Sequence, residues 1–324
     1  METKKEITGA TLKWIAIITM LIDHIGAAIL EPYMGGEFGP MPAKVLGLNP
    51  MIWDFIIRGI GRVAFPIFIF LMVEGFFYTR NRKKYAIRLG LFCLISEIPF
   101  NLGFHPQDME IYSDLPRLKI IDFDYTYQNV FFTLFIGFLT IWVMKVVSDY
   151  FAQRKMRLKP VGACTAEGID LDGGLEEDDV PSHADGVFLD DSDDAENTGG
   201  TSATNGLTME SVCEKLLLGL VIFTGCALAH FLHTDYGFSG VLAIVVCYIV
   251  KKRGGKYIGQ MAAPVIVLSL MNMFEAIAFI DMALVVSYHG KKGKNIGKYF
   301  FYIFYPAHLL ILGLIRWHLS GTSF

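Results

Sequence analysis

Long apolar stretches recur along the whole chain, and they constrain its fold more than any other feature. A transmembrane helix needs roughly 20 mostly apolar residues, and the overall hydrophobic content of 53% is high for a soluble domain. The sequence therefore predicts an all-α, polytopic membrane helix bundle of about nine spans. We expect these spans at residues 12–30, 55–78, 85–104, 130–150, 213–232, 236–251, 256–272, 273–289 and 299–318.

The two spans expected within residues 256–289 are the weakest of the set. Only Asn272 and Glu275 interrupt this apolar region, so it fits either a hairpin of two helices or one long helix. Basic loops favour the hairpin. Merging the two helices would move the loop HGKKGKN to the opposite face of the membrane from the other basic loops.

Clusters of lysine and arginine set the expected orientation, because cytoplasmic loops carry an excess of these residues. With a cytoplasmic N-terminus and an outside C-terminus, every basic cluster falls on the cytoplasmic side. A multi-pass membrane protein with a cytoplasmic N-terminus is therefore predicted, with the lipid bilayer as its surroundings. The clusters lie at Lys4–Lys5, Arg80–Lys84, Arg154–Lys159, Lys251–Lys256 and Lys291–Lys298.

Residues 159–208 differ from the rest of the chain, since they are acidic, rich in glycine and poor in large apolar side chains. Such a composition cannot bury enough apolar surface to offset the entropy of ordering. We expect a disordered cytoplasmic linker between spans 1–4 (residues 1–158) and spans 5–9 (residues 209–324) of one membrane domain. It fits either a regulatory or partner-binding tail or an inert insertion.

Charged side chains inside the expected spans point to a functional site. A charge at the centre of an isolated span costs about 2.5–3.5 kcal/mol on insertion scales, so such residues should face inward. Asp23 and His24 are adjacent in the first span. Further ionisable residues on or inside spans are Arg58, Arg62, Glu74, Glu97, Glu275, Asp281 and His308.

Helix geometry separates the roles of the two neighbours in the first span. His24 follows Lys13 by eleven residues, which places it about 16 Å further along the helix on nearly the same face. Asp23 lies about 100° away, so we expect it to pair with Arg58 or Arg62 on another helix. Together with Asn129, Asp235 and Tyr236 at the outer ends of their spans, these residues predict a polar pocket in the outer half of the bundle.

Several motifs resemble the TraX family of membrane proteins, named for conjugative pilin acetylation. They are LKWIAIITMLIDHIGA, IGRVAFPIFIFLMVEGFFYTRNRKKYAIRL, LISEIPFNL, NVFFTLFIGF, TDYGFSGVL and FYIFYPAHLL, which cover spans one to six and nine in order. That family is similar to the broader transmembrane acyltransferases, in which a basic residue precedes an essential first-helix histidine with ten residues between them. Lys13 and His24 fit this spacing.

The resemblance implies a location in the bacterial cytoplasmic membrane. It also implies transfer of an acetyl group from cytoplasmic acetyl-CoA to an acceptor in the envelope, either a pilin N-terminus or a glycan. His24 would act as the general base, and Tyr305, His308 or Asn129 would donate to the oxyanion of the thioester. Arg62 and Glu97 would hold the pocket together. Basic side chains at Arg80, Arg82 and Lys83, or at Lys251–Lys256, would hold the phosphates of CoA, and Lys13 would lie on the path of its arm.

Two other classes of function remain open on the sequence alone. One is a proton-coupled transporter or flippase that uses Asp23, Glu97, Asp281 and His308 as a relay. The other is a non-catalytic assembly partner whose acidic linker recruits cytoplasmic proteins. Neither a metal nor a nucleic acid is expected as a partner, because the chain carries no zinc-type spacing of cysteine and histidine and no phosphate-binding glycine loop.

Overall fold

The predicted all-α membrane bundle is confirmed by a computed structural model, which describes residues 7–104, 127–158, 209–293 and 299–320. Six helical stretches in these ranges are long and apolar enough to cross a membrane. The count of nine spans stays a prediction, because the other helices are shorter. The six stretches are Gly9–Met34, Pro50–Tyr78, Arg82–Phe104, Val130–Arg157, Met209–Phe231 and Phe300–Leu319. The acidic segment 159–208 lies outside the described residues.

In the first half of the chain, two of the long stretches are compound. The first begins as α1 (Gly9–Ile25), continues as one turn of π-helix, η1 (Gly26–Leu30), and ends as α2 (Glu31–Met34). The second consists of α3 (Pro50–Gly61) and α4 (Ala64–Tyr78), joined through Arg62 and Val63. They are followed by α5 (Arg82–Phe104) and α6 (Val130–Leu158).

The second half of the chain resolves the expectation at residues 256–289 in favour of a hairpin. Here α9 (Tyr257–Met271) ends at Asn272, whose side chain accepts a hydrogen bond from the Phe274 amide at the start of η3 (Met273–Ile280). The chain then packs back against α9 through η3 and α10 (Asp281–Val286). The other helices of this half are α7 (Met209–Phe231), α8 (Gly237–Lys252) and α11 (Phe300–Leu319).

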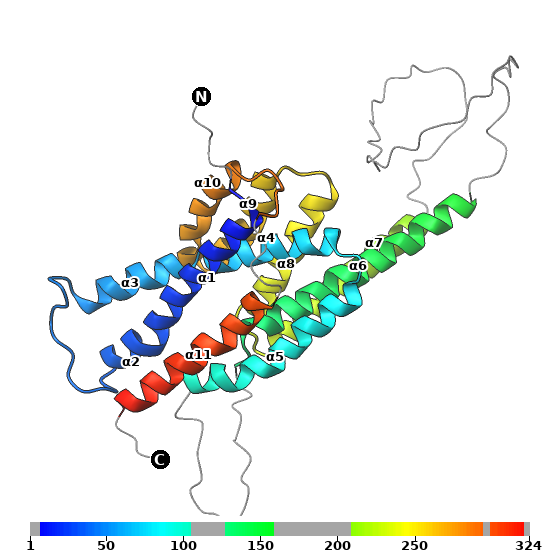
Figure 1. Ribbon diagram of the computed structural model, residues 1–324. Helices are drawn as coiled ribbons and strands as arrows, with labels where there is room; N and C mark the ends of the chain where they lie inside the picture. The colour runs from blue at the N-terminus through cyan, green and yellow to red at the C-terminus, as the bar shows by residue number, and fades with distance from the viewer. Residues whose placement is uncertain (1–6, 105–126, 159–208, 294–298, 321–324) are drawn as a thin grey trace, which may run out of the picture.

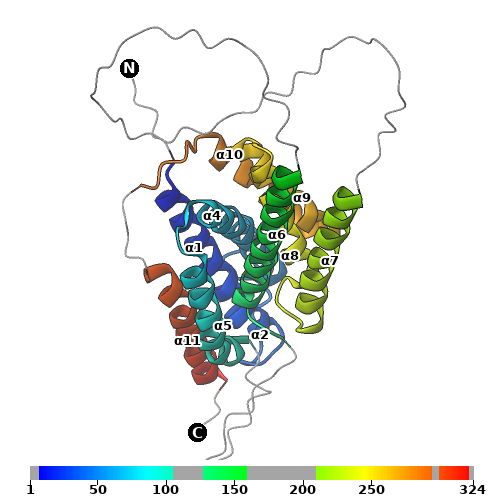
Figure 2. The ribbon, with the colours of Figure 1, turned by 90° about the vertical axis from the view of Figure 1, so that its right-hand side faces the viewer.

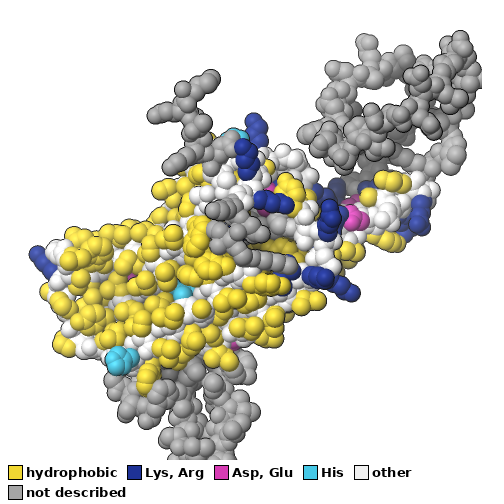
Figure 3. Space-filling view, viewed as in Figure 1, with side chains coloured by type: hydrophobic (Ala, Val, Ile, Leu, Met, Phe, Trp, Pro, Cys, Tyr) yellow, Lys and Arg dark blue, Asp and Glu magenta, His cyan; other side chains and the backbone are white. Residues whose placement is uncertain are grey.

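Helices α1, α5, α6, α7 and α11 run in similar directions, and the two ends of the bundle differ in character (Figures 1 and 2). The beginning of α1, the end of α6 and the beginning of α7 lie at one end, whereas α11 finishes at the other (Figures 1 and 2). Most visible lysine and arginine side chains gather at the first end, and hydrophobic side chains cover much of the remaining visible surface (Figure 3). The first end corresponds to the cytoplasmic end expected from the sequence.

Helix α4 forms the centre of the bundle, because its sequence AFPIFIFLMVEGFFY is apolar around nearly its whole circumference. One side of α4 packs into a hydrophobic cluster with α5, α6 and α8, to which Phe76 and Phe138 belong. Another side joins a second cluster with α1, α9 and α10, to which Phe70 belongs. Helix α4 therefore belongs to both hydrophobic clusters of the bundle.

Candidate functional site

Asp23 is the centre of a network of ion pairs between the first two membrane stretches. Its Oδ2 lies 2.8 Å from Arg58 Nη1, and its Oδ1 lies 3.0 Å from Arg62 Nη2. Arg62 also binds Glu275 Oε1 at 2.9 Å, and Arg58 binds Glu31 Oε1 at 3.0 Å. Pairing of Asp23 with another helix was predicted from the helix angle, and both candidate arginines take part.

Gly61 makes this network possible because it lies against the Asp23 side chain. A Cβ atom at this position would overlap the Asp23 carboxylate itself. Gly26 plays a similar part on α1, where a Cβ would stand 2.7 Å from Ile57 Cγ2 and 3.3 Å from Arg58 Cδ. Helices α1 and α3 therefore approach closely through their glycines, and the charged groups meet in the space that the missing side chains leave.

We predict that Gly61→Ala will destabilise the fold by about 1–3 kcal/mol, the usual cost of overpacking. The methyl group would push the Asp23 carboxylate away from its arginine partners. Thermal unfolding in detergent measures this effect. Gly59→Ala is the matched control, since its Cβ would meet the flexible end of Ile277 at 3.1 Å and Phe274 Cζ at an ordinary 3.8 Å. Equal melting temperatures for the two variants would contradict the proposed close approach.

His24 is hydrogen-bonded to a second histidine from the last helix. Its Nδ1 lies 2.6 Å from His308 Nε2, and the two rings stack with 4.9 Å between centroids and 5° between planes. His308 Nδ1 lies 2.7 Å from the Phe304 carbonyl oxygen, so that nitrogen must be the donor. The neutral His308 Nε2 then accepts a hydrogen bond from the His24 Nδ1–H, so the lone pair of His24 lies on its Nε2.

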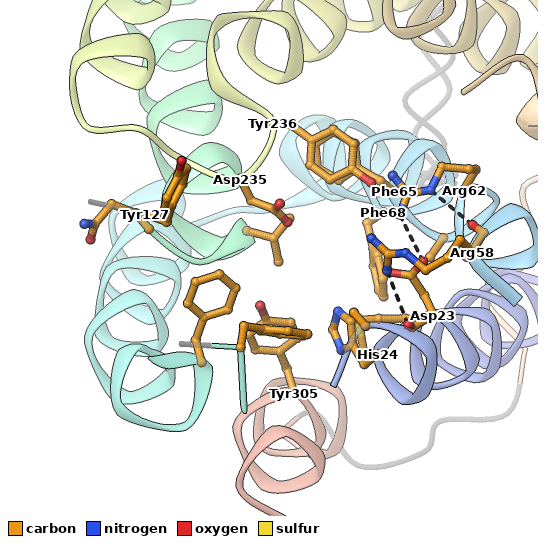
Figure 4. A pocket seen from close by; sticks show the side chains of 18 of the residues that line it. Asp23, His24, Arg58, Arg62, Phe65, Phe68, Tyr127, Asp235, Tyr236 and Tyr305 are labelled. Carbon is orange, nitrogen blue, oxygen red and sulfur yellow. Dashed lines mark hydrogen bonds and ion pairs between the residues drawn. The ribbon is translucent and has the colours of Figure 1, made fainter. Parts of the chain in front are cut away.

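A cavity of about 440 Å³ opens in front of His24 and the ion-pair network (Figure 4). Its walls come from helices that are distant in sequence, which the fold brings together in the outer half of the bundle. Tyr305 lies beside His24, with ring centroids 5.8 Å apart. Residues with functional groups on the walls are Asp23, His24, Glu31, Arg58, Arg62, Tyr127, Gln128, Asp235, Tyr236 and Tyr305.

Asp235 and Tyr236 form the wall of the cavity opposite His24 (Figure 4). They belong to the turn between α7 and α8, and the Tyr236 ring stacks on Phe65 with 3.6 Å between centroids. Burial raises the pKa of the Asp235 carboxyl to about 6. Among the described residues Asp235 forms no ion pair, so near neutral pH this wall presents a carboxylate to whatever enters the cavity.

A second cavity of about 230 Å³ adjoins the first on the side toward the start of α1. Lys13 lines it, with Nζ 5.3 Å from the centroid of the Phe301 ring. The two cavities share four wall residues, Met20, Phe68, Val130 and Tyr305, which we call the waist. Lys13 and His24 therefore lie on one face of α1, as predicted, and each borders one of two adjoining cavities.

Other residues predicted for the site lie elsewhere in the bundle. Asn129, expected as an oxyanion donor, is fully buried, and its amide donates to the Cys93 carbonyl at 2.9 Å and to Glu97 Oε2. These bonds tie α6 to α5, so Asn129 is not on the wall of either cavity. Glu97, predicted to bind substrate or hold the pocket together, likewise lines neither cavity and instead joins α5 to Asn129 at the start of α6.

The basic residues Arg80, Arg82 and Lys83 lie where α4 turns into α5, at the end of the bundle where α1 begins. Arg82 packs over the Phe76 ring, with 4.8 Å from its guanidinium carbon to the centroid. None of the three lines the inner cavity. Their position is compatible with a role at the cytoplasmic surface but not with direct contact to the chemistry near His24.

Sequence reasoning missed several cavity residues. Glu31 extends the ion pairs, and Tyr127, Gln128 and Phe68 complete the walls. Glu31 carries a usable signal, because it lies seven residues after His24, and seven residues on a helix return to nearly the same face. Tyr127 and Gln128 precede α6 without any pattern that separates them from an ordinary loop.

Comparison with known proteins places this architecture in a family. The family model described as "TraX protein" matches residues 8–153 and 204–316, which include every residue of the ion-pair network and both histidines. A relative from Dichelobacter nodosus, described as "Probable fimbrial assembly protein FimC, serogroup H1", is 25% identical over 315 residues, covering 96% of this chain and 97% of the relative. No solved structure matches. This chain, a membrane bundle with a buried histidine pair beside its ion-pair network, belongs to the TraX family.

Proposed function

We propose that this protein is an integral membrane acetyltransferase that moves an acetyl group from cytoplasmic acetyl-CoA to an acceptor in the envelope. The observation that carries the proposal is the bonded pair of His24 and His308, which opens on the outer cavity. The Phe304 carbonyl orients His308, and His308 in turn orients His24. A base held in one tautomer by a second group is the usual arrangement for proton abstraction from a nucleophile.

In the proposed reaction His24 Nε2 removes the proton from an acceptor hydroxyl or amine as that group attacks the thioester carbonyl carbon. The carbon–sulfur bond then breaks, and His24 returns the proton to the departing thiolate of CoA. Tyr305 lies at the waist beside His24, where its hydroxyl is a candidate donor to the carbonyl oxygen as negative charge develops. Arg58 and Arg62 stay engaged with carboxylates and keep the cavity wall in place.

The adjoining cavities supply a path for the donor. The inner cavity lies on the Lys13 side and is lined mainly by apolar and aromatic side chains, which suits a narrow pantetheine arm. Lys13 would attract the phosphates of CoA at its mouth. From there the acetyl end would reach the waist, where Tyr305 separates the inner cavity from the cavity of His24.

The acceptor would enter the outer cavity from the opposite side of the membrane. The fimbrial assembly relative supports a fimbrial or pilin subunit as acceptor, with its N-terminal amine as the nucleophile. A glycan hydroxyl or amine is the other acceptor class consistent with the same base. Asp235 and Tyr236 would contact the acceptor, because they face His24 across the cavity.

The geometry favours group transfer over a proton-relay transporter. Asp23 is held by two arginines, and Glu97 is bound to Asn129, so these acids are committed to structural pairs. Asp281 lines neither cavity, although it is fully buried. The remaining member of that relay, His308, bonds to the histidine that borders the cavity.

Purified protein in detergent provides the test of the proposal. Acetyl-CoA should bind, and in the presence of membrane extract or pilin peptide the free thiol of CoA should appear with time. Acetyl-CoA is expected to bind more tightly to the protein than free acetyl phosphate does, because the inner cavity contacts the pantetheine arm. Absence of CoA binding, together with transport of a solute in vesicles, would contradict the proposal.

Substitution at the waist should change the choice of donor. Met20→Ala removes a buried side chain that borders both cavities, and the added space should admit a longer acyl group. We expect the preference for acetyl-CoA over propionyl-CoA to fall by about 10-fold. This is the lower end of the discrimination that a hydrophobic pocket makes between substrates differing by one methylene. Met72→Ala is the matched control, since Met72 lines only the inner cavity. An unchanged preference in Met20→Ala would exclude the waist as the acyl-selecting element.

A further inference from the structure

A third cavity of about 840 Å³ lies at the end of the bundle where α1 begins, away from the histidine pair. The end of α4, the turn between α8 and α9, and the end of α10 form its walls. From α4, Phe68, Leu71, Met72 and Gly75 line the inner cavity, whereas Phe77 and Tyr78 line the third. None of the described residues lines both cavities, so the two are separate.

The polar groups of the third cavity suit an anion that also carries a hydrogen-bond donor. Lys251 pairs with Glu74, and its Nζ lies 5.4 Å from the centroids of both the Phe77 and the Tyr78 rings. Lys256 lines the cavity and precedes α9, whose first turn has no side-chain cap. Uncapped amides at a helix start, next to a lysine, favour negative charge.

Gln260 adds a second, independent observation at the same place. It is 5% exposed, and its Nε2 donates to the Gly255 carbonyl at 2.6 Å. Its Oε1 has no hydrogen-bond partner among the described residues, although it belongs to a residue that lines the cavity. A buried amide oxygen without a donor is costly, so a ligand hydroxyl or ammonium group that reached it would be stabilised.

Apolar side chains at the same cavity favour a lipid over a soluble phosphate as its ligand. Tyr78, Ile258 and Val286 line the cavity and are 62%, 43% and 59% exposed. A soluble anion gains nothing from these side chains, whereas the acyl chains of a phospholipid would cover them. The combination of basic groups, aromatic rings and exposed aliphatic surface is typical of the cytoplasmic interface of a membrane.

We propose that the third cavity binds the phosphate-bearing headgroup of an anionic phospholipid from the cytoplasmic leaflet. Lys256 and the first-turn amides of α9 would take the phosphate, and Gln260 Oε1 would accept from the headgroup hydroxyl. Ile258 and Val286 would contact the acyl chains. The site is distinct from the donor path, since it shares no wall residue with the inner cavity, and it would therefore function whatever reaction the histidine pair performs.

Lipid retention in detergent tests the proposal. Purified protein is mixed with phosphatidylglycerol or phosphatidylcholine, and bound lipid is counted by native mass spectrometry. Phosphatidylglycerol should bind preferentially, and Lys256→Glu should reduce its retention about 10-fold. This variant should fold, because an acidic residue at a helix start stabilises the helix. Lys145→Glu is the control, as Lys145 pairs with Asp149 on the exposed face of α6.

A second variant and a competitor complete the test. Ile258→Glu should weaken lipid retention by opposing the acyl chains while it leaves the phosphate contacts in place. CoA serves as the soluble phosphate probe, and it should not displace phosphatidylglycerol. Equal retention in Lys256→Glu and Lys145→Glu would overturn the proposal. Displacement of the lipid by CoA would also overturn it and would assign the cavity to the nucleotide end of the donor.

Discussion

Replacing His24 with alanine is expected to lower the rate of acetyl transfer by about 10²–10⁴-fold, the range for loss of a general base. The structure gives the reason, since His24 Nε2 is the nitrogen left without a proton by the bonds among Phe304, His308 and His24. Release of the CoA thiol from acetyl-CoA in the presence of acceptor measures the effect. Acetyl-CoA binding should be almost unchanged, because His24 does not line the inner cavity.

Two further variants separate chemistry from folding. His308→Ala should lower the rate less than His24→Ala, because it removes the orientation of the base but not the base. His230→Ala is the matched control, since His230 lies at the end of α7 and does not line either cavity. If His24→Ala transfers acetyl groups as fast as His230→Ala while both remain folded, His24 is not the base.

Replacing Arg62 with methionine is expected to cost about 3–5 kcal/mol of stability, the usual effect of removing one partner from buried ion pairs. Arg62 binds Asp23 and Glu275, whose side chains are 12% and 5% exposed. Without the guanidinium, Glu275 keeps no cation within salt-bridge distance among the described residues, and Asp23 keeps only Arg58. Thermal unfolding in detergent should show a large decrease in melting temperature.

Neutralising the two carboxylates that lose Arg62 should restore part of this stability. The triple variant Arg62→Met, Asp23→Asn and Glu275→Gln should melt above Arg62→Met alone, because neutral amides tolerate burial better than unpaired carboxylates. Arg62→Lys should fall between the wild type and Arg62→Met, since one ammonium cannot reproduce the two-sided fork of the guanidinium. A melting temperature of Arg62→Met equal to that of the wild type would contradict a stabilising role for the network.

Much of the fold was predictable because apolar length and basic loops carry most of the information in a membrane chain. The break at Asn272 was visible as a polar residue between two apolar runs, and the structure shows the hairpin there. The π-helix at Gly26–Leu30 was not predictable, because it depends on how α1 packs against α3 at Gly26. No periodicity in the sequence marks such a local change of hydrogen bonding.

The site was only partly predictable. Asp23 could be assigned to Arg58 or Arg62 because a helix angle excludes a dyad with His24, and both arginines bind it. The bond between His24 and His308 joins residues 284 positions apart, and it depends on the packing of α11 against α1. Asn129 was expected near the reacting atoms, but its side-chain amide donates to two acceptors on α5 instead. Buried amides are nearly always hydrogen-bonded, and the sequence does not show which acceptor will lie closest.

The most direct test of acetyl transfer by His24 is mass spectrometry of envelope proteins and glycans from cells that carry the wild-type gene, no gene, or the His24→Ala gene. We predict that one envelope component carries an added acetyl mass only with the wild-type gene. Cells with the His24→Ala protein, present in the membrane at normal levels, should resemble cells without the gene. An acetylation pattern identical in all three strains, or one that His24→Ala fully restores, would contradict the account.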